Sequence, residues 1–139
     1  MEMRTVLGSC IGLAVYDPRS KVGGIVHVML PESRGNSVKP GKFADTGVPA
    51  LIKQIIANGG VKSNLQVKIS GGAKMFAFAT SSAMDIGARN IEAVHQALAE
   101  EGLKISREDV GGTKGRKLIV DCETGDIYSQ IIGEDKILL

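Results

Sequence analysis

Hydrophobic residues in the first thirty positions fall into two runs, 11–16 and 22–29, separated by the polar segment Asp17-Pro18-Arg19-Ser20. Two apolar runs joined by a short segment of turn-forming residues predict a β-hairpin. Residues 1–7 predict a further strand that leads into this hairpin. With a symmetric loop, Cys10 lies directly opposite His27 in the predicted register, and directly opposed residues share one face of a sheet.

The rest of the chain alternates between helical and strand-like patterns. The first helix is predicted before Gly59-Gly60 by apolar residues at i, i+3 and i+4, namely Val48, Leu51, Ile52, Ile55 and Ile56. A second helix is predicted over 86–101, where Gly102 stops it. Strands are predicted at 65–69, 103–105, 118–121 and 127–132. Two helices among about six or seven strands favour one α+β layered domain over residues 1–139, rather than a parallel doubly wound fold.

Composition and charge argue against two broad classes of function. The chain has 139 residues, of which 18 are glycine and none is tryptophan, and its formal net charge is +2. So small a charge, without an aromatic platform on which bases could stack, argues against a nucleic-acid partner. No charged leader precedes an apolar run, and no segment approaches the ~18 apolar residues of a membrane span. We therefore expect a cytoplasmic protein without membrane insertion.

The candidate chemistry lies in the pair formed by Cys10 and His27. A thiol and an imidazole at opposed positions can share a hydrogen bond, and the imidazole can take the thiol proton or stabilise the thiolate. Glycines at positions 8, 23 and 24 indicate close backbone approach at a site around this pair. The alternative is that Cys10 is a small buried apolar residue and His27 a strand histidine with a backbone partner. Spacing alone leaves both interpretations open.

The other cysteine and histidine have simpler interpretations. The two cysteines and two histidines lack CxxC or HxxxH spacing, so we expect no metal site. Both cysteines are expected to be free thiols. Cys122 ends a predicted strand and is interpreted as structural, and His95 as a packed or half-exposed helix residue.

Two further groups have both a structural and a functional interpretation. Lys114, Arg116 and Lys117 form a basic patch, which is either a solvated loop or a contact for an acidic partner. Met75 and Phe76 either fill the core or, if exposed, form a hydrophobic knob for protein docking.

A series of short motifs follows in order along the chain from Thr5 to about Ile132. They are Leu7-Gly8-Ser9-Cys10, Gly24 with His27-Val28-Met29-Leu30-Pro31, Gly71-Gly72-Ala73 with Met75-Phe76, Ile86-Gly87 with Arg89-Asn90, Asp109-Val110-Gly111-Gly112 with Gly115-Arg116, and Thr124-Gly125. Each motif is common by itself, but the ordered set resembles the CheD family of chemoreceptor glutamine deamidases.

The resemblance implies an α+β cysteine hydrolase, similar in fold to bacterial deamidating toxins, that acts as a protein-glutamine glutaminase. Its implied reaction hydrolyses selected glutamines on the cytoplasmic helices of chemotaxis receptors to glutamate and releases ammonia. By position, Cys10 corresponds to the nucleophile, His27 to the general base and Thr5 to the threonine that completes the triad, without a metal or cofactor. The resemblance also implies a partner, a CheC-type phosphatase of the response regulator CheY. Family members usually have a strand-forming segment upstream of the threonine, whereas this chain begins almost at Thr5.

Two other classes of function remain open at this point. The first is a non-catalytic adaptor that docks on receptors or on a CheC-type phosphatase. Thiol alkylation separates it from an enzyme, because an activated Cys10 should react near neutral pH much faster than Cys122. The second is a cysteine protease, which needs a groove for an extended main chain.

Overall fold

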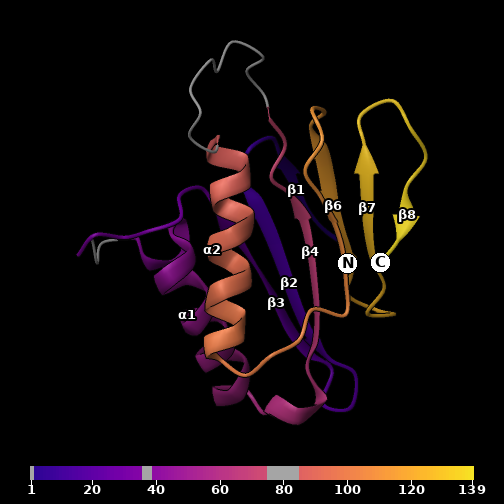
Figure 1. The fold of residues 1–139 in the computed structure, drawn as a ribbon. Helices are drawn as coiled ribbons and strands as arrows, with labels where there is room; N and C mark the ends of the chain where they lie inside the picture. The colour runs from indigo at the N-terminus through magenta and orange to yellow at the C-terminus, as the bar shows by residue number, and fades with distance from the viewer. Residues whose placement is uncertain (1, 36–38, 75–84) are drawn as a thin grey trace.

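Two four-stranded sheets and two helices stack as three layers in the computed structural model of this chain, which describes residues 2–35, 39–74 and 85–139 (Figure 1). The helix-covered sheet consists, in spatial order, of β3 (Val22–Val28), β2 (Ile11–Asp17), β4 (Gln66–Gly71) and β5 (Arg107–Val110). The outer sheet consists of β1 (Glu2–Leu7), β6 (Arg116–Asp121), β7 (Ile127–Ile131) and β8 (Ile137–Leu138). Helices α1 (Ala44–Ala57) and α2 (Ile86–Glu100) lie on one face of the helix-covered sheet (Figure 1). This arrangement confirms the α+β fold class.

Strand β2 is buried on both faces because it lies between the helices and the outer sheet. Its residues Ile11, Leu13 and Val15 belong to the core under the helices, whereas Ala14 belongs to the core between the sheets. Alternate residues of a strand point to opposite faces, so Gly12 faces the outer sheet as Ala14 does. A Cβ on Gly12 would lie 2.8 Å from Leu118 Cδ2. The missing side chain therefore lets the two sheets approach closely at this position.

Both helices form as the apolar spacing predicts, with small differences in their bounds. Helix α1 begins at Ala44, earlier than its apolar pattern indicates, so that Pro49 lies inside it. Helix α2 ends at Glu100 and buries Val94 and Leu98 against the sheet. In the described part of the chain, no helix combines the length and hydropathy that a bilayer span requires.

The strand predicted over 103–105 is wrong. This segment connects α2 to β5, which begins at Arg107 and pairs in parallel with β4. Leu103 and Ile105 are apolar because they pack against the core under the helices, and not because they pair in a sheet. The short strand β8 was not predicted. Met75 and Phe76 lie outside the described residues.

A buried polar network joins the two sheets and corrects the prediction of a basic patch. Ser70 Oγ of β4 lies 2.7 Å from Ser129 Oγ of β7, and Ser129 donates to Asp109 Oδ2 at 2.6 Å. Arg116 is only 3 % exposed and donates to Asp109 Oδ1 at 2.9 Å, so it is not a surface residue. Lys114 is exposed and forms an ion pair with Glu134.

Packing against α1 and against β2 explains the two glycines that precede His27, in place of the predicted close approach at a site. A Cβ on Gly24 would lie 2.8 Å from Leu51 Cδ1 of α1. A Cβ on Gly23 would lie 2.8 Å from both the ring of Tyr16 and the carbonyl oxygen of Val15. The absence of side chains here lets α1 and the adjacent strand lie close to β3.

Candidate active site

The predicted register of the first hairpin is wrong by two residues. His27 pairs with Gly12, and Asp17 pairs with Val22, so Cys10 does not lie opposite His27. Cys10 lies in a bend just before β2. A shift of two residues keeps a side chain on the same face of a sheet. Accordingly, Cys10 packs against the core between the sheets together with Ile25, which precedes His27 by two positions on β3. Cys10 and His27 therefore both belong to the space between the sheets.

Thr5 and His27 connect the two sheets directly. Thr5 lies on β1, where Met3, Thr5 and Leu7 are the more buried residues and alternate with exposed ones. Its Oγ1 atom lies 2.8 Å from Nδ1 of His27, a hydrogen-bond distance. This contact fixes the orientation of the imidazole ring. It also leaves Nε2 as the ring nitrogen available for proton exchange with another group.

The backbone around Cys10 is fixed by the segment that follows β4. The amide of Gly72 donates to the carbonyl oxygen of Cys10 at 2.9 Å, and the amide of Ala73 donates to that of Gly8 at 3.0 Å. Gly71 has φ +108°, and a Cβ at this position would overlap the carbonyl oxygen of Cys10. Only glycine readily combines this backbone angle with such a close approach. The glycine pair at the end of β4 is therefore required for the position of the cysteine.

Asn90 of α2 is a site residue that the sequence analysis did not single out as functional. Its side chain is fully buried, and its Nδ2 atom donates to the carbonyl oxygens of Ser9 and Met29, both at 3.0 Å. One amide thus ties the residue before Cys10 to the end of the segment that carries His27. The signal was present in the sequence: Asn90 is a polar residue in the apolar i, i+4, i+8 stripe completed by Val94 and Leu98.

Burial favours the neutral forms of both reactive groups. It raises the pKa of the Cys10 thiol and lowers the pKa of the His27 imidazole. Removing a group from water disfavours its charged form, which gives opposite shifts for an acid and a base. At neutral pH the Cys10 thiol and the His27 imidazole therefore both favour their neutral forms, and a neutral imidazole can act as a proton acceptor.

The other candidate residues lie apart from this arrangement. His95 is partly exposed, and its Nε2 lies 2.8 Å from Glu108 Oε2. Cys122 lines a cavity of about 110 Å³ between the sheets, whose lining includes Tyr16 from the far end of β2. Both cysteines are free thiols. Within the residues that the structure describes, no group of three or more His, Cys, Asp or Glu side chains could hold a metal ion.

Comparisons with known proteins all indicate one family. Residues 29–130 match the family model described as CheD, chemotactic sensory transduction. A Clostridium botulinum protein (strain Alaska E43), named "Probable chemoreceptor glutamine deamidase CheD", is 52% identical over 130 residues, which cover 91% of this chain and 80% of the relative. The Thermotoga maritima "Chemoreceptor glutamine deamidase CheD" is 44% identical over 127 residues (91% and 79%). A Methanococcus vannielii relative, again named as probable, is 42% identical over 127 residues (91% and 82%).

Proposed function

This chain belongs to the CheD family, and we propose on that basis that it is a chemoreceptor glutamine deamidase. It hydrolyses the carboxamide of receptor glutamines to a carboxylate and releases ammonia. The observation that carries this proposal is the identity of 44% to 52% with named deamidases over 91% of the chain. The hydrogen bond between Thr5 and His27, in the space that Cys10 also borders, supports a thiol mechanism.

In this mechanism Cys10 is the nucleophile and His27 the general base. His27 Nε2 takes the thiol proton while Sγ bonds to the carboxamide carbon, and the carbonyl oxygen becomes an oxyanion. Backbone amides, that of Cys10 among them, stabilise this oxyanion. The C–N bond then breaks, and the imidazolium gives its proton to the departing ammonia, which leaves a thioester. His27 next takes a proton from water, and the resulting hydroxide attacks the thioester. The C–S bond then breaks while the imidazolium returns this proton to Sγ, and the new carboxyl group ionises, which leaves a glutamate side chain on the receptor and restores the thiol and the neutral imidazole.

Thr5 is a positioning residue in this scheme. If Nε2 exchanges protons with Cys10, then Nδ1 carries the other ring proton and donates it to Thr5 Oγ1 at 2.8 Å. The threonine then fixes the tautomer and the ring plane, as the third member of a catalytic triad does.

Location and partners follow from the same proposal. The substrate is the cytoplasmic helical part of a chemoreceptor, so the protein acts in the cytoplasm. A CheC-type phosphatase is the protein partner that the family resemblance implies. The reaction needs no metal or cofactor, since the thiol, the imidazole and water supply every atom that is transferred.

Mass spectrometry of a receptor cytoplasmic fragment tests this function. The fragment is incubated with the native protein, with Cys10→Ala and with the matched control Cys122→Ala. We expect specific glutamines to gain the mass of an amide-to-acid exchange with the native and Cys122→Ala proteins only. Unchanged glutamines with the native protein would reject the deamidase, and equal modification by folded Cys10→Ala would reject Cys10 as the nucleophile.

A further inference from the structure

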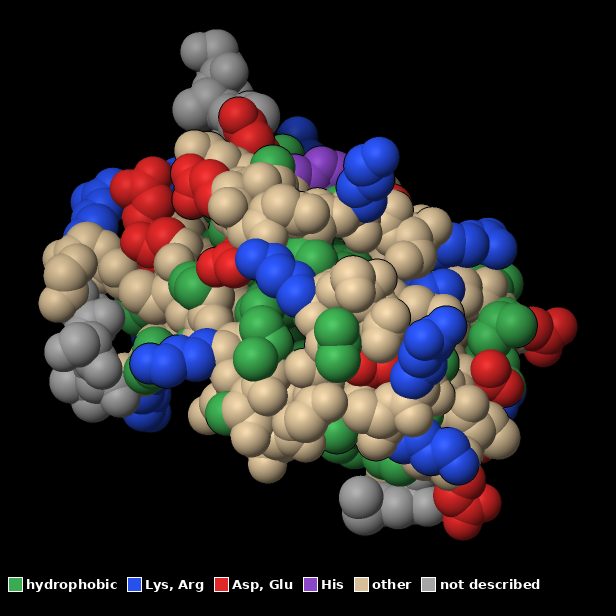
Figure 2. Space-filling model, turned by 90° about the horizontal axis from the view of Figure 1, so that it is seen from below, with side chains coloured by type: hydrophobic (Ala, Val, Ile, Leu, Met, Phe, Trp, Pro, Cys, Tyr) green, Lys and Arg blue, Asp and Glu red, His purple; other side chains and the backbone are tan. Residues whose placement is uncertain are grey.

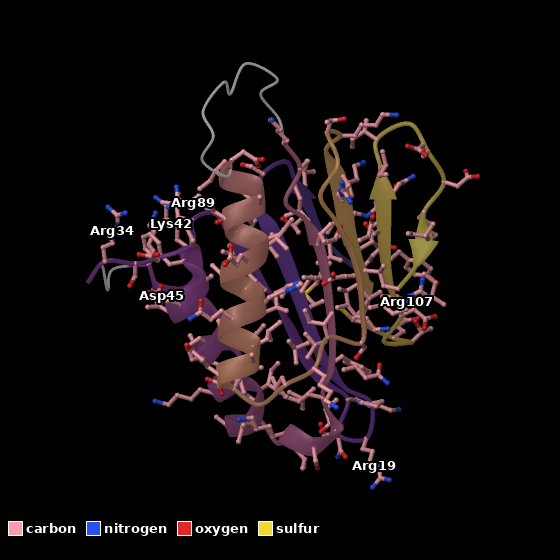
Figure 3. All side chains as sticks on the ribbon, viewed as in Figure 1. Arg19, Arg34, Lys42, Asp45, Arg89 and Arg107 are labelled. Atoms are coloured by element: carbon pink, nitrogen blue, oxygen red, sulfur yellow. The ribbon has the colours of Figure 1, made fainter. Side chains whose placement is uncertain are left out.

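A groove with a basic rim lies where the chain leaves β3 and passes the first turns of α1 and α2. Its volume is about 450 Å³. Leu30, Phe43 and Ile86 give it an apolar floor, and Arg34, Lys42 and Arg89 give it a basic rim. We call it the basic groove. Figure 3 shows Arg34, Lys42 and Arg89 gathered on one side of the molecule, although they come from three separate segments.

The cations of the basic groove have no carboxylate partner among the described residues, and Lys42 Nζ lies 5.9 Å from the centroid of the Phe43 ring. Among the described residues, Arg34, Lys42 and Arg89 form no ion pair, and all three are exposed. Of the residues that the structure describes, Glu32 is the carboxylate that lines the groove. Asp45 lies near the rim and accepts hydrogen bonds from the backbone amide of Ser33 at 2.9 Å and from its hydroxyl at 3.0 Å, which leave its negative charge in place. The three cations still outnumber these two carboxylates, so the groove has an excess of positive charge that favours an anionic occupant.

The basic groove is joined to the candidate active site by the backbone. The amide of Met29 donates to the carbonyl oxygen of Lys42 at 2.8 Å, and the amide of Ala44 donates to that of Leu30 at 3.0 Å. Asn90 then ties the carbonyl oxygen of Met29 to that of Ser9, next to Cys10. Arg89 is the neighbour of Asn90 on α2. A segment bound in the groove is therefore held in a fixed place relative to the cysteine.

We propose that the basic groove binds the carboxylate of a glutamate that accompanies the target glutamine on the receptor segment. This inference rests on the proposed function, because the reaction itself creates such carboxylates. Each hydrolysed glutamine becomes a glutamate, so a segment with two target glutamines carries a carboxylate after the first turnover. The apolar floor contacts the hydrophobic face of the same segment. The groove thus makes a partly deamidated receptor segment a better substrate than an unmodified one.

Two synthetic peptides from the receptor segment test the proposal. They share one target glutamine and differ only at a second target position, which is Gln in one and Glu in the other. Ammonia release gives kcat and KM for the native protein, for the double variant Lys42→Glu with Arg89→Glu, and for Arg19→Glu. Arg19 is an exposed arginine at the opposite end of the molecule (Figure 3), so it is a matched control. Figure 2, which shows the molecule from below, has positive and negative side chains interspersed on that face.

We expect the native protein and Arg19→Glu to favour the Glu peptide about tenfold in kcat/KM, mostly through KM, as two exposed ion pairs together permit. Added salt should reduce this preference. The double variant should lose or invert it. Equal kcat/KM for the two peptides with the native protein, or the same preference in the double variant, would overturn the proposal.

Binding of the same peptides to Cys10→Ala protein, measured by fluorescence anisotropy, separates this inference from the deamidase proposal. If no ammonia is released but the Glu peptide binds more tightly, and charge reversal at the groove removes the difference, the groove stands while the enzymatic function fails. If ammonia is released and neither peptide nor variant alters binding, the deamidase stands while the groove fails. Self-association abolished by the groove variants would assign the groove to a second copy of the chain and also overturn the proposal.

Discussion

Replacing Asn90 by aspartate tests whether one buried amide holds the Cys10 segment against the end of β3. Asp is nearly isosteric with Asn, so the substitution changes the chemistry of the contact and leaves its shape. The native Nδ2 donates to two carbonyl oxygens at 3.0 Å, whereas a carboxylate has no proton to donate. Because the side chain is fully buried, water does not replace the lost donor.

The loss of folding stability in Asn90→Asp depends on pH, because the new carboxyl group is buried beside two carbonyl oxygens. At low pH the new carboxyl is protonated and donates one hydrogen bond in place of two, which costs on the order of 1–3 kcal/mol for the carbonyl left without a donor. Burial beside two carbonyl oxygens raises the folded-state pKa above the unfolded value of about 3.9. As pH rises through this interval, the unfolded state ionises first. The loss of stability therefore grows by about 1.4 kcal/mol per pH unit until the folded-state pKa is reached.

Urea unfolding of native and Asn90→Asp proteins between pH 4 and pH 8 measures this difference. The matched control is Asn58→Asp, because Asn58 is exposed and its Nδ2 donates to the carbonyl oxygen of Gln54 at the end of α1. A charge at that helix terminus should cost at most about 1 kcal/mol. The rate of Cys10 alkylation should also differ between the native and the Asn90→Asp proteins. A stability difference that is flat with pH, or equal to that of the control, would refute the role given to Asn90.

Three further outcomes are expected. Thr5→Val should lower kcat/KM of deamidation about three- to tenfold, since a neutral hydrogen bond contributes about 0.5–1.5 kcal/mol. Thr5→Ser keeps the hydroxyl and should restore most of the lost kcat/KM. An unchanged rate in Thr5→Val would remove Thr5 from the site. Because burial lowers the pKa of His27 and the base acts in its neutral form, the acid limb of the kcat/KM profile should lie below the usual 6.5, and a limb at or above 6.5 would contradict the direction of the shift. Gly71→Ala should lower the free energy of unfolding in urea clearly more than Gly59→Ala. Both glycines have positive φ, but only at Gly71 would the added Cβ overlap the Cys10 carbonyl oxygen. Equal losses of stability would show that backbone strain alone causes the effect.

Strands and helices were predictable where local patterns decide them, and the hairpin register shows where that information ends. The polar segment after β2 identified a turn but not the pairing of Asp17 with Val22, which occurs together with several hydrogen bonds of the Asp17 side chain. Its carboxylate accepts from the amides of Arg19 and Ser20 within the turn and from the amide of Val61 at 2.8 Å. These hydrogen bonds lower the pKa of Asp17 to about 2. A partner so distant in sequence leaves no trace in the local pattern, so the longer loop could not be predicted.

The predictions about the basic patch at Arg116 and about the glycines before His27 depart from the structure for the same reason. Arg116 belongs by sequence to a basic loop, yet its guanidinium is buried because Asp109 faces it across the junction of the sheets. Gly24 precedes a candidate catalytic residue, yet its role is to admit Leu51 of α1. In each case the partner comes from an element whose position only the assembled layers define. The role of Asn90, by contrast, was predictable from the sequence. A polar residue in an apolar helical stripe indicates a buried hydrogen bond, even when its acceptor is not known.

The candidate site takes one residue from each of the three layers, and this origin explains why it lies where it does. Thr5 comes from the outer sheet, His27 from the helix-covered sheet and Asn90 from the helices, and each makes a hydrogen bond to another layer or to the segment between layers. Close contact of the sheets at Gly12, the partner of His27, brings Thr5 within 2.8 Å of the imidazole. A hydrogen bond weakens steeply as its geometry is lost. The reactive arrangement therefore depends on the packing of all three layers, and the native fold supplies the preorganisation that two residues of a single hairpin would lack.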